Sequence, residues 1–380
     1  MAEEALGCPL AGDHPRAATA LIEEVVCEHG AAVLERIVGL RGSAGGTGEL
    51  PAELEHVLAV IGRAAQSRPI AWAPSFGPVA ELALKPAAQA LANADYQAVL
   101  QFVAELGSRG ELSSAKIEVG QPVELRIGAR RVPCSDTLEV CAPDDESRLR
   151  VDGAGLDARL IQASSVTLGL VPSTGQSIEV QLLERPQALG LECGEPQSPT
   201  HFEEASQQLR EGLDLIRGYA SAWEHWVLDV LREVRMVDGS DAIMRSGSDP
   251  RSPGAIRMSF PSSPVQVAEM LVHECSHQRF HLAERLGAVV NGADVALYNS
   301  PVKQCGRPLE AILLAYHAFA NVLLFYRSCI ESGLDDGGYC ERNIDRHGPE
   351  LAELLRPLRE TDGLTEVGDF LWRPLAELIQ

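Results

Sequence analysis

The sequence predicts an α+β fold that is mainly helical, and three observations lead to this prediction. Up to about residue 112, apolar and charged residues recur at a helical period. Between residues 113 and 195 the period changes to two, with turn residues between the runs, which is typical of a small antiparallel sheet. The helical period then returns. We therefore expect a helical N-terminal region (1–112), a β-rich section (113–195) and a mainly helical C-terminal domain (200–380).

The composition indicates a globular protein with room for two or three domains, since the chain has 380 residues and 45% of them are hydrophobic. Lys and Arg number 32 against 54 Asp and Glu, so the formal net charge is −22. This excess of negative charge disfavours nucleic acids and anionic membranes as partners, because both reward clustered positive charge.

The sequence also predicts a cytoplasmic location. The N-terminus is acidic where a signal peptide would be basic, and no stretch reaches the roughly 20 apolar residues of a membrane span. The nine cysteines are scattered without a CxxC pair, which is typical of reduced thiols. We expect Cys134 and Cys141, the closest pair, to be core or loop thiols.

Periodicity predicts the elements of the first two sections. Helices are expected at Ala17–Leu40, Ala52–Ser67 and Ala87–Glu105. Strands are expected from about Ile117 onward, with clear alternation at 123–127, 166–170 and 178–182 and a turn at Asp152-Gly153.

The C-terminal domain opens with a capping-box spacing at Thr200 and Glu203, which predicts a long helix to about Val234. Trp223, within this helix, is expected in the core. A short strand is expected at Ile256–Phe260, and its free edge can pair with an extended peptide.

The most strongly marked helix runs from Ser263 to Gly287. Ser263 is a good N-cap, Pro264 suits the first helical position, and Gln266 completes a capping-box spacing. Gly287 marks the end of the helix. One apolar stripe runs along this helix through Leu271, Cys275, Leu282 and Leu286.

His273 and His277 lie on another face of the same helix. They are four residues apart, so their side chains lie one above the other. Two imidazoles at this spacing can bind one metal ion, and Glu274 lies beside them. Because the match falls inside a capped helix with an apolar stripe, we interpret it as a metal site.

A third ligand must come from elsewhere. His281 is another full turn along the helix, with its Cα about 12 Å along the axis from that of His273, which excludes it as a ligand of the same ion. The next helix, predicted at 307–329, carries Glu310 and His317 seven residues apart on one face. Either residue can complete the site, and their spacing leaves both open.

Four short motifs stand out in the C-terminal domain: Leu-Val-His-Glu-Cys-Ser-His at 271–277, Tyr298, Arg-Pro-Leu at 307–309 and Phe-Tyr-Arg at 325–327. Together they resemble the HExxH-motif domain found in bacterial peptide-modification gene clusters, over roughly residues 255–327. Members of that family are regarded as 2-oxoglutarate-dependent peptide β-hydroxylases. The N-terminal two-thirds of the chain shows no part of this resemblance.

The resemblance implies that the metal is Fe(II), that 2-oxoglutarate is the cosubstrate, and that the partner is a peptide substrate of the kind made by ribosomes as a precursor. Non-haem iron oxygenases hold the metal by three protein ligands on one side. We expect His273, His277 and His317 in this role. The position matching the downstream histidine of other members is Phe319 in this sequence.

The far carboxylate of 2-oxoglutarate needs a cation, and the planar fork of Arg meets a carboxylate through two hydrogen bonds. We expect Arg307 to bind it, with Arg327 as the second choice.

Two alternatives stay open. In a zinc metallopeptidase, Glu274 is the general base and Glu310 the third Zn(II) ligand, although Leu314 stands where such peptidases carry an acidic residue. In a degenerate domain, the helix only binds a leader peptide for a partner enzyme. The intact motif at 273–277 argues against that second alternative.

Overall fold

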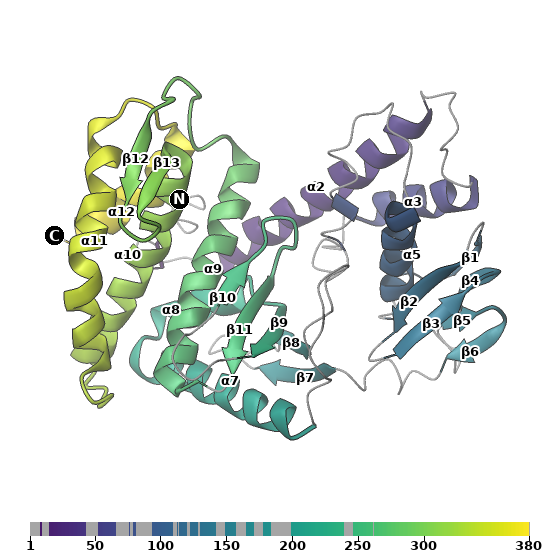
Figure 1. Ribbon diagram of the computed structural model, residues 1–380, viewed down its shortest axis with the longest axis horizontal. Coiled ribbons are helices and arrows are strands. Elements are labelled where there is room, and N and C mark those ends of the chain that lie inside the picture. The colour runs from purple at the N-terminus through teal and green to yellow at the C-terminus, as the bar shows by residue number, and fades with distance from the viewer. Residues whose placement is uncertain are drawn as a thin grey trace. The chain divides into compact units, whose positions relative to one another are not determined.

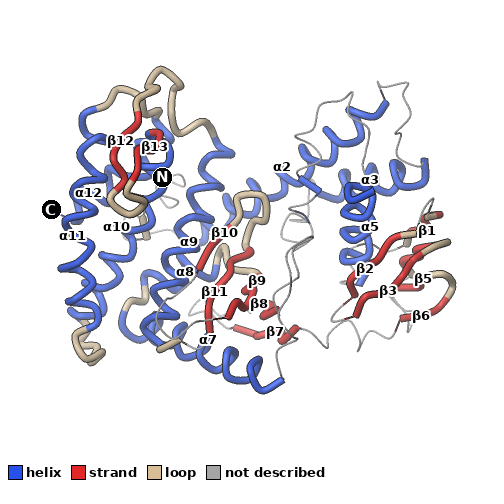
Figure 2. The backbone as a smooth tube through the Cα atoms, viewed as in Figure 1, coloured by secondary structure: helices blue, strands red, loops and turns tan. Residues whose placement is uncertain are grey.

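The computed structural model shows helices joined to several small sheets, which confirms the predicted α+β class (Figures 1 and 2). Two compact units divide the chain: unit 1 comprises residues 1–22, 167–250 and 254–380, and unit 2 comprises residues 23–166 and 251–253. The structure describes residues 8–9, 15–42, 52–65, 76, 79–80, 93–108, 112, 114–119, 122–127, 130–141, 149–156, 165–170, 178–183, 199–238, 246–260 and 262–379.

Unit 2 combines helices with small antiparallel sheets. Its elements are α2 (Pro15–Gly42, which begins in unit 1), α3 (Ala52–Ala65), α5 (Asn93–Ser108), β1 (Ala115–Glu118), β2 (Val123–Ile127), β3 (Arg130–Cys134), β4 (Thr137–Val140), β5 (Leu149–Val151) and β6 (Ala154–Leu156). The described helices agree with the three predicted ones to within a few residues at most ends, while residues 87–92 of the last lie outside the described part.

The strands of unit 2 form a sheet of order β1-β4-β5-β6 and a separate β2-β3 hairpin. Helix α5 contacts β2, β4 and β5, and Leu100 on this helix is fully buried. Cys134 and Cys141 are both buried in the core and are not paired in a disulfide bond within the described part of the chain, as expected.

The predicted turn at Asp152-Gly153 joins β5 to β6. Both residues have positive φ, 49° and 77°, which is the conformation that a two-residue type I′ hairpin needs. The Asp152 carboxylate accepts hydrogen bonds of 2.7–2.9 Å from the backbone N–H groups of Ser135, Asp136 and Thr137. Burial opposes its ionisation, but these hydrogen bonds outweigh burial and lower the pKa of Asp152 to about 2.

Unit 1 is built on a five-stranded mixed sheet of order β10-β11-β9-β8-β7. Strand β9 runs parallel to β8 and to β11, and β10 runs antiparallel to β11. The strands predicted near 166–170 and 178–182 therefore pair in the same sheet as strands of the C-terminal domain. The bounds are β7 (Ser165–Leu170), β8 (Ile178–Leu183), β9 (Glu233–Asp238), β10 (Ser246–Ser248) and β11 (Ala255–Phe260).

The single long helix predicted from Thr200 to about Val234 is wrong. The chain instead forms α7 (Pro199–Tyr219), a short α8 (Ala222–Leu228) and then β9. Val234 and Met236 alternate as buried positions of β9, which pairs with β8 and β11; this pairing outweighs the local helical period. Helix α7 also begins at Pro199, so Thr200 lies inside the helix and not at its N-cap.

The free edge predicted for the strand at 256–260 is also wrong. Strand β11 lies between β9 and β10, so both of its edges are paired. The three-residue strand β10 is the outer strand on this side of the sheet.

The C-terminal part of unit 1 is a helical layer with one hairpin (Figure 1). Helix α10 begins two residues later than predicted because Arg307 and Pro308 belong to the hairpin. It packs against α9, α11 and α12. The elements are α9 (Pro264–Leu286), β12 (Leu297–Ser300), β13 (Cys305–Pro308), α10 (Leu309–Glu331), α11 (Tyr339–Glu360) and α12 (Glu366–Ile379).

Within the described chain, α10 alone has the length and apolarity of a membrane span. In its most apolar window, 72% of the residues are buried inside the protein. Most of this apolar surface is therefore covered by the neighbouring helices.

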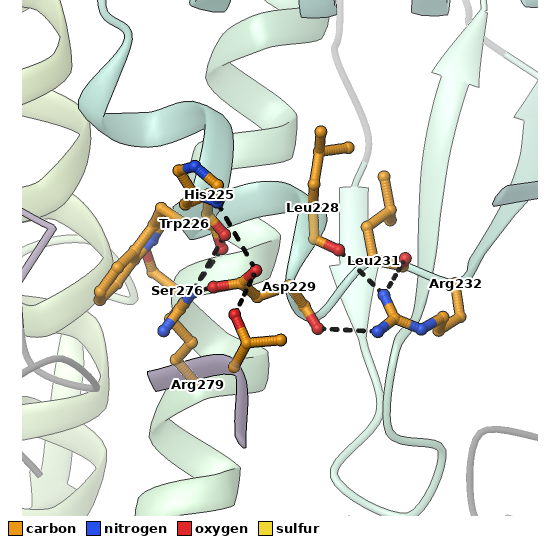
Figure 3. A network of polar contacts seen from close by, with 9 residues as sticks. His225, Trp226, Leu228, Asp229, Leu231, Arg232, Ser276 and Arg279 are labelled. Atoms are coloured by element: carbon orange, nitrogen blue, oxygen red, sulfur yellow. Dashed lines mark hydrogen bonds and ion pairs between the residues drawn. The ribbon is translucent and has the colours of Figure 1, made fainter. Parts of the chain in front are cut away.

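A buried arginine ties α9 to α8 and the turn after it (Figure 3). Arg279 is 2% exposed; its Nε donates to the carbonyl of Trp226 at 3.0 Å, and its Nη2 donates to the carbonyl of His225 at 3.1 Å and to the carboxylate of Asp229 at 3.2 Å. The guanidinium also lies 4.3 Å from the centroid of the Trp226 ring. The indole N–H of Trp226 in turn donates to Ser276 Oγ at 2.9 Å.

We expect Asp229→Ala to lower the free energy of unfolding by about 3–5 kcal/mol, because it leaves the buried Arg279 guanidinium without its carboxylate. Urea unfolding followed by tryptophan fluorescence measures the change. Asp214→Ala is the matched control. Asp214 pairs with Arg217 at 3.2 Å, but its side chain is 70% exposed, so its loss should cost about 1 kcal/mol or less. Equal losses in the two variants would contradict the assigned role of Asp229.

Candidate metal centre

The histidine pair lies on α9, whose N-terminus is fixed by local sequence. The predicted capping box is present, because Gln266 Oε1 accepts a hydrogen bond from the Ser263 backbone N–H at 2.9 Å. Three members of the predicted apolar stripe are buried, but Leu286 at the end of the helix is 38% exposed. The stripe is therefore one turn shorter than predicted, and it still anchors the part of the helix that carries the pair.

The two imidazole rings converge. The Nε2 atoms of His273 and His277 lie 3.1 Å apart, and their ring centroids are separated by 4.7 Å at nearly perpendicular planes. A zinc ion takes imidazole nitrogens at about 2.0–2.1 Å, so one ion fits both nitrogens at this separation. The same distance also permits a hydrogen bond between the rings, which needs one of them to be protonated at Nε2.

Burial favours the neutral, metal-binding form of His277. It lowers the pKa of His277 well below the usual value, because the charged ring would lose its hydration. The charge of Lys303 lowers it further, as would a proton on His273, His281 or His317. Little proton competition for the ring nitrogens is expected near neutral pH. The Nδ1 atom of His277 is buried and has no hydrogen-bond partner among the described residues.

Glu274 is 3% exposed and is held by the outer strand of the sheet. Ser246 on β10 donates a hydrogen bond to its Oε1 at 2.6 Å. Its other oxygen, Oε2, is buried and has no partner in the described part of the chain. The carboxylate therefore has one fixed oxygen and one that is available to another group.

Contacts between α9 and α10 show that the two helices run antiparallel. Glu310 hydrogen-bonds to Glu284, His317 lies near His277, and the Phe319 ring lies 5.2 Å from that of His273. Residue numbers thus fall along α9 as they rise along α10. This register decides which residues of α10 lie at the level of the pair.

The register separates the two candidate third ligands. Glu310 lies seven residues before His317, or about 10 Å along the helix axis, and it belongs with Glu284 and His281. Burial, then the neighbouring Glu284, raise the pKa of Glu310. His281 Nδ1 lies 2.8 Å from Glu284 Oε2. The structure thus places Glu310 away from the pair and His317 at its level.

The ring of His317 is fully buried between aromatic neighbours. Its centroid lies 5.8 Å from that of Trp226 and 6.0 Å from that of Phe280. Within the residues that the structure describes, no three His, Cys, Asp or Glu side chains gather into a preformed metal-binding group. The structure therefore brings His273 and His277 together and places His317 nearby without joining it to them.

Phe319, the position that matches the downstream histidine of the HExxH-motif proteins, faces His273. The ring of His347 from α11 also lies near Phe319, with centroids 5.5 Å apart, and its Nδ1 is 2.7 Å from Glu350 Oε2. A carboxylate at Nδ1 is the usual support of a histidine that binds metal through Nε2. Sequence reasoning did not identify His347, because no spacing within the motifs points to α11.

The two predicted anchors for 2-oxoglutarate have different surroundings. Arg327 donates from Nη1 and Nη2 to the carbonyls of Leu378 and Ile379, so it caps the end of α12. Arg307 is half-buried in β13, where it pairs with Tyr298 of β12. Arg327 is thereby engaged in holding α12. Arg307 lies two residues before the start of α10, at the end of that helix where Glu310 is found.

Sequence reasoning also missed Lys303 and Ser246. Lys303 lies in the turn between β12 and β13, and its charge reaches His277. The next residue, Gln304, has a positive φ of 52°, and its N–H donates to the Ser300 carbonyl at 2.7 Å. Neither residue lies in a recognisable motif, so only the folded chain shows that they approach α9.

Comparison of the chain with models of known protein families and with curated proteins gives no match.

We expect His273→Ala and His277→Ala each to abolish stoichiometric Fe(II) binding, because the remaining ligands do not hold an ion in a fixed geometry. Metal analysis after anaerobic purification measures it. His281→Ala is the control, since that ring contacts Glu284 one turn further along α9 and should leave the metal content unchanged. Stoichiometric iron in either of the first two variants would show that the pair is not the site.

We expect His317→Ala to lose the metal and Glu310→Ala to retain it, because only His317 lies at the level of the pair. The same metal analysis on His347→Ala tests the other histidine near Phe319. Retention in His317→Ala with loss in His347→Ala would assign the third ligand to α11. Loss in Glu310→Ala alone would favour the peptidase arrangement.

Proposed function

We propose that this protein is an Fe(II)- and 2-oxoglutarate-dependent dioxygenase that hydroxylates the β-carbon of a residue in a ribosomally synthesised peptide. The observation that carries the proposal is the convergence of the His273 and His277 Nε2 atoms at 3.1 Å, with His317 at the same level of the adjacent helix. The four motifs that resemble the HExxH-motif peptide hydroxylases favour iron over zinc.

In this proposal His273, His277 and His317 hold the iron, and the His317 ring turns from its aromatic neighbours toward the pair. Three protein ligands on one side leave positions for the cosubstrate and for oxygen. When bound, iron and 2-oxoglutarate supply the oxidation: 2-oxoglutarate and O₂ become succinate and CO₂, and one oxygen atom enters a C–H bond of the substrate.

The cosubstrate needs a cation for its far carboxylate, and the β12–β13 hairpin carries two. Arg307 offers a planar fork for bidentate binding. Lys303, at the turn of the same hairpin, has its charge close to His277. We assign Arg307 to the far carboxylate and Lys303 to the electrostatic attraction of the dianion toward the site.

The outer strand β10 is the structural feature that favours a peptide as the substrate. Its residues pair with β11 on one side, and an extended peptide can add to the other side by main-chain hydrogen bonds. Ser246 on this strand contacts Glu274, next to the histidine pair. An uncharged or basic extended segment suits a protein of net charge −22, and a cytoplasmic location suits a ribosomal product.

A zinc metallopeptidase is the second candidate, because Glu274 is buried beside the pair with one oxygen unpartnered. That arrangement suits a general base. The peptidase was expected to use Glu310 as third ligand, however, and Glu310 lies about 10 Å along the axis from the level of His277. This displacement favours the hydroxylase.

Glu274→Gln distinguishes the two candidates. In the hydroxylase no general base is needed to remove the hydrogen, so we expect the variant to keep its metal and to retain measurable conversion of 2-oxoglutarate to succinate. In the peptidase, loss of the base should cost on the order of 10²–10⁴ in rate. Succinate release is measured beside mass spectrometry of a pooled library of synthetic peptides, in search of a gain of one oxygen atom.

Reactions without 2-oxoglutarate and without O₂ are the controls for this experiment. Peptide cleavage that needs no 2-oxoglutarate, and that disappears in Glu274→Gln, would replace the hydroxylase by the peptidase. Absence of succinate with the iron-loaded wild-type protein, together with absence of cleavage with the zinc-loaded one, would contradict both candidates.

A further inference from the structure

The carboxylate of Glu274 is held from outside its own helix. Glu274 lies about 60° around the helix axis from His277, at 100° per residue, on the side where α9 contacts β10. The donor that reaches it is Ser246 Oγ, at 2.6 Å from Oε1. This distance lies at the short end of the range for a hydroxyl-to-oxygen hydrogen bond.

The second carboxylate oxygen of Glu274 indicates what the contact with Ser246 does. Oε2 is buried without a partner in the described chain, and an unpaired buried carboxylate oxygen is costly. An unsatisfied buried oxygen of this kind calls for an explanation. The serine thus fixes one oxygen and thereby decides where the free one points.

The donor, Ser246, also lies on a strand at the edge of the sheet. Ser246 belongs to β10, the outermost strand on its side of the sheet, and it is exposed. A peptide that adds to this edge lies directly beside Ser246. A peptide bound along β10 would therefore act on the same Ser246–Glu274 hydrogen bond that orients Glu274.

We propose that Ser246 is a positioning residue, which aims Glu274 Oε2 at the open side of the histidine pair and couples that orientation to peptide on the β10 edge. This deepens the proposed function and rests on it for the identity of the reaction. The positioning itself depends only on the Ser246–Glu274 contact.

The first test uses Co(II) alone as the probe and needs no activity. Ser246→Ala and Glu274→Gln should each bind one Co(II) ion. Both should change its visible absorption spectrum in the same direction, because both alter how the side chain at position 274 is held beside the ion. Ser246→Thr keeps the hydroxyl and should restore the wild-type spectrum. Ser248→Ala is the matched control, since Ser248 lies two residues along the same strand and on the same face.

The second test measures coupling, with the best-hydroxylated peptide of the synthetic library as the probe. The ratio of succinate formed to peptide hydroxylated should rise about 10-fold in Ser246→Ala, since a hydrogen bond to a charged group typically corresponds to one or two factors of ten. Ser246→Thr and Ser248→Ala should keep the wild-type ratio. The double variant Ser246→Ala/Glu274→Gln should be no worse than Glu274→Gln, because both changes act through one carboxylate.

The outcomes separate this inference from the proposed function. If the wild-type protein does not convert 2-oxoglutarate, the hydroxylase proposal is contradicted. The Co(II) spectra still test the role of Ser246 in that case. A Ser246→Ala spectrum identical to that of the wild type overturns the positioning role. So does additive loss in the double variant, or loss of folded circular dichroism in Ser246→Ala, which would make the serine structural.

Discussion

The antiparallel packing of α9 against α10 determines which side chains surround the histidine pair. Phe319 contacts His273, His317 lies level with His277, and Glu310 meets Glu284 two turns away. A shift of α10 by two turns would exchange a histidine for a carboxylate at the pair and would suit a different chemistry. Which of the two proposed chemistries the pair would suit thus depends on a helix register, and both helices are held by buried apolar residues.

The opposite side of α9 explains how this register is kept. Arg279, Ser276 and the indole of Trp226 form a buried polar network toward α8, while the histidines lie on the face toward Phe319. The polar network fixes the rotation of α9 about its own axis, because hydrogen bonds are directional where apolar contacts are not. One helix can therefore present two imidazoles on one face while Arg279 and Ser276 are hydrogen-bonded on the other.

Much of the site could be predicted from sequence because its signals are local. The Ser263–Gln266 capping box and the His273–His277 spacing are set within single helical turns, and both are present. Residues brought in by distant elements could not be predicted: Ser246 belongs to a three-residue strand, and His347 reaches Phe319 only through the packing of α11. The long helix expected after Thr200 failed because tertiary pairing with β8 and β11 favours a strand at Val234 over the local helical period.

Helix α10 has a consequence for the synthesis of the protein. Its composition is that of a membrane span, and it is buried by α9, which is made before it, and by α11 and α12, which are made after it. Another 48 residues separate the end of α10 from the end of α12. At about 5–20 residues per second, translation leaves one flank of this helix uncovered for on the order of 2–10 s. During that interval the nascent chain presents a long apolar surface to chaperones and to other nascent chains, so the yield of folded protein should depend on how fast its last two helices follow.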